Sequence, residues 1–240
     1  MTTDRTAVVT GAGSGIGRAT ALLLADLGYR VAAADLDEAS AHETAAAADG
    51  ITGYGVDVTD DRSVAALADA LGALDVVISC AGWDETYQFL ETTPDFWAKV
   101  VAINYLGVVR MAHAFLPAMV ERGAGGRIVN VASDAGRVGS SGESVYAGAK
   151  GGVIAFTKSI AREMARHAIT ANAVCPGPTE TPLFRRQPER IQEALERAIP
   201  MRRLATPDDV AHAIAYFASE PAGFVTGQVL SVSGGLTMHG

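Results

Sequence analysis

The chain has 240 residues, of which 49% are hydrophobic, and carries a formal net charge of −8. This length and apolar content suit one large α/β core, and the lack of a basic run argues against a nucleic-acid partner. The sequence contains no run of about 18 apolar residues, so no membrane span is predicted. Residues 1–5 lack the apolar core of a secretory signal, and we therefore expect a cytoplasmic protein.

Short apolar runs alternate with helical patterns along the whole chain. A strand at residues 7–9 precedes a glycine-rich turn and a helix that ends near residue 27; strands at 29–34, 52–58 and 75–79 then alternate with helices at 37–48 and 60–71. A long helix is predicted over residues 93–122, with a kink or break near Pro117 because proline lacks an amide proton. Strands at 127–132 and 170–174 flank a helix at 144–167, and helices at 189–198 and 207–218 precede a last strand at 229–232.

This alternation predicts the fold class. Continuous apolar strands, each followed by a helix, indicate a single doubly wound, Rossmann-type α/β domain over residues 1–240, with a parallel sheet flanked by helices on both faces and right-handed crossovers. The stretch at 176–207 is too long for an ordinary connection, so we expect it to be a lid or substrate loop.

Neither cysteines nor histidines suggest special chemistry. Cys80 and Cys175 each end an apolar run and are interpreted as reduced, buried thiols. The histidines are scattered without ligand spacing, so no metal is predicted.

A glycine-rich turn follows the first strand, in Thr10-Gly11-Ala12-Gly13-Ser14-Gly15-Ile16-Gly17. Glycines there let the backbone approach a pyrophosphate, whose charge the helix N-terminus favours; we therefore assign cofactor binding to Gly11, Ser14, Gly15, Ile16 and Gly17. Asp35, at the end of the second strand, could accept the ribose hydroxyls of NAD and would repel the 2′-phosphate of NADP. The alternative is that Asp35 only caps the next helix. Asp57 and Val58, predicted to end the third strand, would lie beside the adenine.

Tyr146 and Lys150 lie one helical turn apart. An ammonium near a phenol favours the phenolate, lowers the tyrosine pKa and prepares it to exchange protons with a hydroxyl or carbonyl. Taken alone, the pair also fits a solvated helix face.

Together these motifs resemble the short-chain dehydrogenase/reductase family over essentially the whole chain. The resemblance implies that Asn104, Ser133, Tyr146 and Lys150 are catalytic, with Tyr146 as the proton acceptor, Ser133 bonded to the same substrate oxygen, and Asn104 holding a water that links Lys150 to solvent. It also implies that the nicotinamide meets Pro176 and Gly177, with Thr179 and Thr181 within reach of its carboxamide and Lys150 at its ribose. The other implied cofactor-binding residues are Ala81, Gly82 and Tyr146. One departure is Cys80 in Ser79-Cys80-Ala81-Gly82, where the family usually has an asparagine that supports the central sheet.

In residues 81–84, 132–143, 175–181 and 226–238 the chain is similar to dehydrogenases of 2-hydroxycyclohexanecarboxyl-CoA, which implies a cyclic β-hydroxyacyl-CoA oxidised with NAD. The candidate substrate residues are Trp83, Asp134, Arg137, Ser141 and Glu143. Arg185 and Arg186 either meet the CoA phosphates or are solvated loop residues.

Other functions stay open: a 3-oxoacyl-ACP or 3-oxoacyl-CoA reductase, a dehydrogenase of simple secondary alcohols, or a catalytically idle NAD-binding regulator. The resemblance further implies a homotetramer formed through the two long helices and the last strand, with His239 and Gly240 near a neighbour's site.

Overall fold

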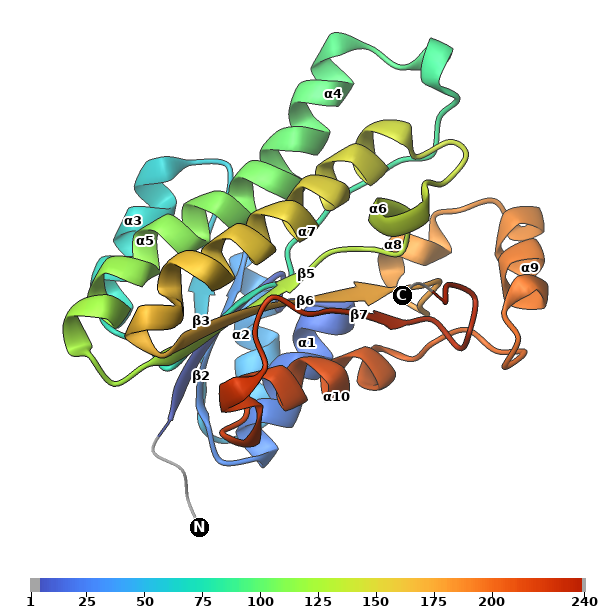
Figure 1. Ribbon diagram of the computed structural model, residues 1–240. Coiled ribbons are helices and arrows are strands. Elements are labelled where there is room, and N and C mark those ends of the chain that lie inside the picture. Colours follow the sequence, from blue (N-terminus) through green and yellow to red (C-terminus); the bar gives the residue numbers. More distant parts are fainter. Residues whose placement is uncertain (1–4, 239–240) are drawn as a thin grey trace.

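A seven-stranded parallel sheet forms the centre of the computed structural model, which describes residues 5–238 (Figure 1). The expectations for residues 1–4, His239 and Gly240 fall outside the described residues. The strand order is β3-β2-β1-β4-β5-β6-β7. The strands are β1 (Thr6–Thr10), β2 (Arg30–Asp35), β3 (Ile51–Gly55), β4 (Val76–Ser79), β5 (Gly126–Val131), β6 (Ile169–Pro176) and β7 (Val229–Val232).

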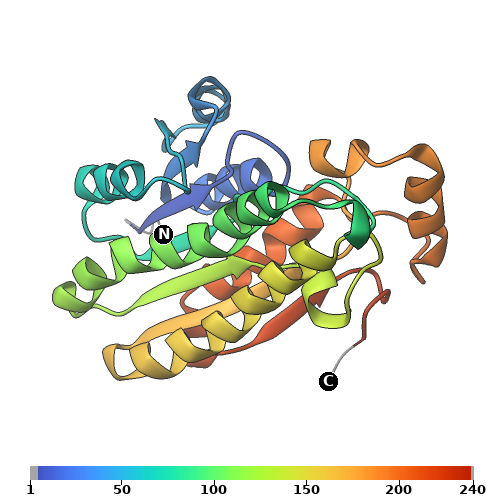
Figure 2. The ribbon, with the colours of Figure 1, turned by 90° about the horizontal axis from the view of Figure 1, so that it is seen from above.

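Helices cover both faces of this sheet (Figure 1). On one face lie α1 (Gly15–Asp26), α2 (Glu38–Ala46) and α10 (Pro207–Ala218); on the other lie α3 (Asp61–Leu71), α5 (Gly107–Arg122) and α7 (Ser144–Met164). From above, α5 and α7 run side by side over the sheet, and α4 (Pro94–Val101) continues beyond the start of α5 (Figure 2). Four-residue helices α6 (Ala135–Val138) and α8 (Pro182–Arg185) and the longer α9 (Glu189–Ala198) lie at the end of the sheet where β5 and β6 finish. Short 3₁₀ turns are Phe89–Glu91, Ala165–His167 and Pro221–Phe224.

Alternate residues of each strand pack against different helices. In β1, Val9 belongs to the cluster that contains Leu24 of α1 and Ile214 of α10, whereas Val8 packs with Phe115 of α5. Both faces are therefore dry, which explains why the strands appear in the sequence as continuous apolar runs. The predicted Rossmann-type α/β fold is confirmed.

The strand order reverses between β1 and β4, because the chain runs from β1 outward to β2 and β3 and then returns to β4 on the other side. In such sheets the crevice at the carboxyl ends of the strands beside this reversal is the usual ligand site. The loops after β1, β4, β5 and β6 open at this edge.

Three local predictions need correction. The third strand ends at Gly55, so Asp57 and Val58 follow the strand instead of ending it. The sixth strand extends through Pro176, which pairs with Val232 of β7. The long helix is not broken at Pro117, which lies inside α5; its irregularity is a π-helical segment, Ala102–Leu106.

The combined helix Pro94–Arg122 is long and apolar enough to span a membrane by length and composition alone. Length and composition are weak support for a span, because the buried core helix of a soluble protein has them too. Met111, Phe115 and Met119 of this helix are fully buried in the cluster that also contains sheet residues.

Candidate active site

A cleft of about 1410 Å³ opens at the carboxyl ends of the strands. It is lined by all the residues predicted to contact the cofactor: Gly11, Ser14, Gly15, Ile16, Gly17, Asp35, Asp57, Val58, Ala81, Gly82, Tyr146, Lys150, Pro176, Gly177, Thr179 and Thr181. Ser133, Trp83, Asp134 and Glu143 line it too. Among the described residues, Asn104, Arg137 and Ser141 were also predicted for the site but are not part of this lining.

The glycine-rich turn forms one end of the cleft. Gly11 has a φ of +68°, and a Cβ atom there would lie 2.8 Å from the Cα of Ala81; at Gly17 it would lie 2.1 Å from the carbonyl oxygen of Gly11. Neither position accepts a side chain. Ser14 precedes α1 without a capping hydrogen bond from its side chain, and in the described chain no acidic residue occupies the first turn. The N-terminus of α1 is therefore open to an anion such as a pyrophosphate.

Asp35 holds this turn from the neighbouring strand. One carboxylate oxygen accepts a hydrogen bond from the Gly13 amide at 2.8 Å, and the other accepts from the Asp37 amide at 3.0 Å. The cap of α2 is Asp37, whose side chain accepts from the Ser40 amide, so the view of Asp35 as only a helix cap is wrong. Asp35 fixes the turn and presents its carboxylate to the cleft, where the next residue, Leu36, is 74% exposed.

The carboxyl end of β4 is anchored to β1. The Thr10 hydroxyl accepts hydrogen bonds from the amides of Cys80 at 3.1 Å and Ala81 at 3.2 Å. The central strands β1 and β4 are therefore connected at this point, although Cys80 replaces the usual asparagine.

Asn104 lies in the π-helical segment and is fully buried. Its amide nitrogen donates to the carbonyl oxygens of Trp83 at 2.6 Å and Val100 at 2.9 Å, and its oxygen accepts from the Trp83 amide at 3.2 Å. In a π turn the Val100 carbonyl loses the backbone N–H donor that an α-helix would give it, and the Asn104 side chain replaces that donor. The same side chain fixes the loop after β4 through its bonds to Trp83. Both donor hydrogens are used, so a bound water would have to donate to the remaining lone pair of the oxygen.

Ser133, Tyr146 and Lys150 meet in the middle of the cleft. The Lys150 ammonium donates to the Val131 carbonyl at 2.9 Å and lies 5.7 Å from the centre of the Tyr146 ring. The Ser133 hydroxyl hydrogen-bonds the phenol. Burial lowers the pKa of Lys150 to about 8.

The expected lowering of the Tyr146 pKa is wrong for the protein's own groups. Burial raises this pKa first, the carboxyls of Glu143 and Asp84 raise it further, and the Ser133 hydrogen bond only partly opposes them. The prediction rested on the ammonium one helical turn away and left out the carboxyl of Glu143, three residues before Tyr146. Burial and the approach of Asp84 depend on the fold, and no local pattern contains them.

The segment at 176–207 closes one side of the cleft. Thr181 caps α8 by accepting from the Phe184 amide at 3.2 Å, and its side chain lies against Gly15 of the glycine-rich turn. The two arginines of this segment differ: Arg186 lines the cleft, whereas Arg185 pairs with Glu180 outside it.

Sequence comparisons identify a family and relatives that match nearly the whole chain. A profile of the family described as "Enoyl-(Acyl carrier protein) reductase" matches residues 11–237. The (3R)-3-hydroxyacyl-CoA dehydrogenase of Homo sapiens is 39% identical over 248 residues, covering 97% of this chain and 95% of that protein.

The chain belongs to the short-chain dehydrogenase/reductase family.

Two further relatives are similar over nearly their whole length. The acetoacetyl-CoA reductase of Shinella zoogloeoides is 38% identical, with 97% of this chain and 98% of that protein covered. The 3-oxoacyl-[acyl-carrier-protein] reductase FabG of Thermotoga maritima is 35% identical, with 96% and 97% covered. As a member of this family, the protein is an oxidoreductase enzyme that uses a nicotinamide cofactor.

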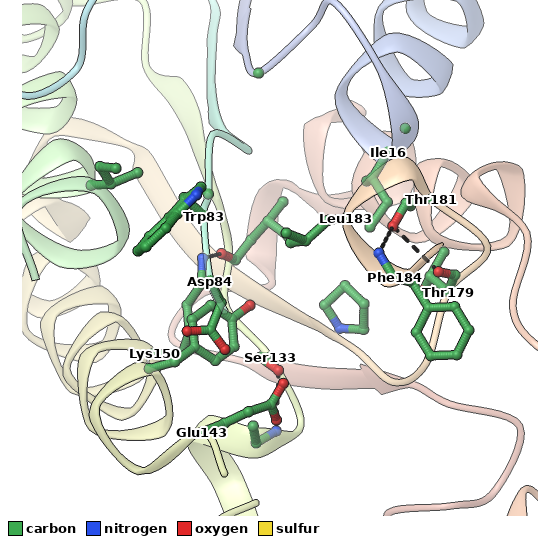
Figure 3. Close-up of a pocket in the computed structure, with 18 of the residues that line it drawn as sticks. Ile16, Trp83, Asp84, Ser133, Glu143, Lys150, Thr179, Thr181, Leu183 and Phe184 are labelled. Atoms are coloured by element: carbon green, nitrogen blue, oxygen red, sulfur yellow. Dashed lines mark hydrogen bonds between the residues drawn. The ribbon is translucent and has the colours of Figure 1, made fainter. Parts of the chain in front are cut away.

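One residue of the cleft was missed by sequence reasoning. Asp84 is only 8% exposed, and neither of its carboxylate oxygens makes a hydrogen bond of full geometry with a described residue, although the adjacent Glu85 amide acts on the group. An aspartate two residues beyond a glycine gave no signal of burial, because its environment comes from α7, far away in the sequence (Figure 3).

No group of three or more histidine, cysteine, aspartate or glutamate residues within positions 5–238 has the geometry to hold a metal ion. The prediction of a metal-free mechanism stays a prediction.

Proposed function

We propose that the enzyme transfers hydride between the β-carbon of a 3-hydroxyacyl thioester and NAD. The observation that carries this proposal is the shared cleft: the glycine-rich turn and Asp35 line one end, and Ser133, Tyr146 and Lys150 line the middle. A nucleotide bound on the turn would bring its nicotinamide toward the Tyr146 phenol. This makes the idle NAD-binding regulator the least favoured of the alternatives.

The choice of NAD rests on charge. The carboxylate of Asp35 faces the place where the adenosine ribose would lie, and it can accept hydrogen bonds from two hydroxyls while repelling a 2′-phosphate. The exposed neighbour Leu36 supplies no compensating positive charge.

The chain's own residues supply proton transfer and positioning. Bound oxidised nicotinamide would accept the hydride and add a positive charge beside the phenol. Tyr146, ionised to the phenolate, then takes the proton of the substrate hydroxyl as the C–H bond breaks, because an alcohol releases hydride readily only while it loses its proton. Ser133 holds the same oxygen, and the ammonium of Lys150, fixed by the Val131 carbonyl, opposes the effect of burial on the phenol.

The substrate class comes from the relatives' names and from the cleft. The three relatives reported above are named for 3-hydroxyacyl-CoA, acetoacetyl-CoA and a 3-oxoacyl carrier protein, all of which have an oxygen β to a thioester. Arg186 lies in the lining of the same cleft, where a phosphate of CoA could meet it. Within this class, we propose a cyclic substrate of the 2-hydroxycyclohexanecarboxyl-CoA type.

Reduction of a 3-oxoacyl thioester is the second candidate. Two of the relatives are named as reductases, so the same site could work in that direction with NADH as hydride donor. We further propose a cytoplasmic homotetramer, as expected from the family.

A substrate panel tests the proposal. NADH formation should be followed with (3R)-3-hydroxybutyryl-CoA, 2-hydroxycyclohexanecarboxyl-CoA, their free acids and cyclohexanol, each with NAD and with NADP. We expect the highest kcat/KM with a thioester and NAD. Equal rates with the free acids would rule out thioester recognition, and a preference for NADP would rule out the role given to Asp35.

A further inference from the structure

The side chain of Asp84 points into the catalytic part of the cleft from the loop after β4. Figure 3 shows it between Trp83 and the group formed by Lys150, Ser133 and Glu143. Both of its oxygens are buried, and neither makes a hydrogen bond of full geometry with a described residue; the backbone N–H of the next residue, Glu85, only partly stabilises the ionised form. A buried polar group without a partner is costly, so its presence in a binding cleft indicates that a ligand supplies the partner.

The surroundings of Asp84 decide its protonation. The carboxyl groups of Glu143, at the start of α7, and of Glu85, its chain neighbour, raise the pKa of Asp84, whereas the Glu85 backbone N–H and the Lys150 ammonium on α7 lower it. Tyr146 is close enough for its own ionisation to be affected by Asp84. Burial, with Glu143 next, raises the pKa of Asp84 to about 7. Near neutral pH much of the enzyme therefore carries a neutral carboxyl group here, with an O–H for which no described residue provides an acceptor.

We propose that Asp84 is a positioning residue whose protonated carboxyl group donates a hydrogen bond to the thioester carbonyl of the substrate. This inference rests on the proposed function. In a 3-hydroxyacyl thioester one carbon separates the carbinol carbon from the carbonyl carbon, so the carbonyl oxygen lies close to the reacting hydroxyl. With the hydroxyl held by Ser133 and Tyr146, Asp84 faces the same space from the opposite loop.

The proposal explains why an acid is found in this place. Ionised Asp84 would present two acceptor oxygens to a carbonyl, which is itself only an acceptor, and binding would be weakened. The protonated form offers the donor that the carbonyl needs. A substrate with an ammonium group or an additional hydroxyl would instead favour ionised Asp84, and the test below separates these cases.

Asp84→Asn and Asp84→Ala provide the test. Asparagine has nearly the same shape and offers an N–H donor at every pH, whereas alanine offers none. The KM of the thioester and the Kd of its complex with the enzyme and NADH should be measured from pH 6 to 9 for the wild type and both variants. Asp95→Asn, the same change at an exposed position of α4, is the matched control.

In the wild type, KM should rise with pH above about 7 by up to about tenfold per pH unit, as the protonated fraction falls. In Asp84→Asn this rise should be absent, and in Asp84→Ala KM should be raised at all pH values, by more for the thioester than for cyclohexanol. Asp95→Asn should follow the wild type.

Two results would overturn the inference: an Asp84→Asn enzyme whose KM rises with pH as in the wild type, or one whose KM exceeds that of the wild type at high pH, which would mean that the ionised acid recognises a donor. A large loss of kcat without a change of KM would also overturn it, since that is the effect of a proton relay. Failure of the proposed function is a different result, in which the wild type oxidises cyclohexanol but no thioester.

Discussion

Replacing Asp35 by asparagine should change both cofactor choice and stability. Each oxygen of the carboxylate accepts one backbone N–H, from Gly13 and from Asp37. Asparagine has only one oxygen, so its NH₂ group must face one of these two donors. Loss of one such bond and exposure of an unpaired amide cost about 1–3 kcal/mol. For a chain of this size that corresponds to a decrease in Tm of about 2–12 °C.

The effect on cofactor choice comes from charge. A carboxylate about 4 Å from a 2′-phosphate is disfavoured by about 1–4 kcal/mol per unit charge, depending on solvent exposure. Removing that charge should lower the ratio of kcat/KM for NAD over NADP by roughly 5- to 1000-fold. The assay is NADH or NADPH formation at saturating alcohol, with thermal unfolding followed in parallel.

Asp37→Asn is the matched control, because it removes the same charge two residues away and asparagine caps a helix as well as aspartate does. It should leave the cofactor ratio and Tm close to those of the wild type. If Asp35→Asn keeps the wild-type ratio while losing stability, the carboxylate holds the glycine-rich turn but does not select the cofactor.

Three other changes test the site. Tyr146→Phe should lower kcat by about 100- to 10,000-fold in the same oxidation assay, as expected for a lost general base, and near-wild-type turnover would contradict that role. Glu143→Gln removes a negative charge that raises the pKa of Tyr146, so the rise of the oxidation rate with pH should move to lower pH. The control Glu163→Gln, at an exposed position near the other end of α7, should leave this pH profile in place. An unmoved or upward-shifted profile in Glu143→Gln would show that this charge does not act on the phenol. Thr10 is 1% exposed, and Thr10→Val leaves the amides of Cys80 and Ala81 without their shared acceptor. The free energy of unfolding in urea should fall by about 2–6 kcal/mol, whereas Thr10→Ser should keep most of it. Equal stability of the two variants would mean that these bonds do not stabilise the fold.

The elements that the sequence predicted well are those set by local chemistry. Both faces of the sheet are covered, so β1 and β4 are apolar throughout residues 7–9 and 76–78 and easily recognised. The start of α10 at Pro207 follows from Thr206 and Asp209, which form a capping box. The order of Ser133, Tyr146 and Lys150 along the chain was enough to place them on neighbouring elements.

What the sequence did not reveal depends on contacts between distant segments. Pro117 does not end α5, because the helix is held on the sheet by Phe115, Leu116 and Met119, whose burial offsets the lost hydrogen bond. The irregularity arises at Asn104, whose side chain bonds to Trp83, 21 residues earlier. The environments of Tyr146 and Asp84 likewise depend on burial and on charges from separate elements, because Asp84 acts on Tyr146 and both Glu143 and Lys150 act on Asp84. Only Glu143 beside Tyr146 and Glu85 beside Asp84 lie within a local pattern.

The π-helical segment Ala102–Leu106 has a further consequence for how this chain can change. A π turn amounts to one extra residue within an α-helix, and each residue of an α-helix turns it by about 100°. Deleting a single residue there would restore a regular helix but would rotate α4 against α5 by that angle and move the Asn104 amide away from the Trp83 loop. The geometry of this part of the site therefore depends on helix length as well as on side-chain identity. An alignment that places a gap in this segment marks a different active site, even where every aligned residue is the same.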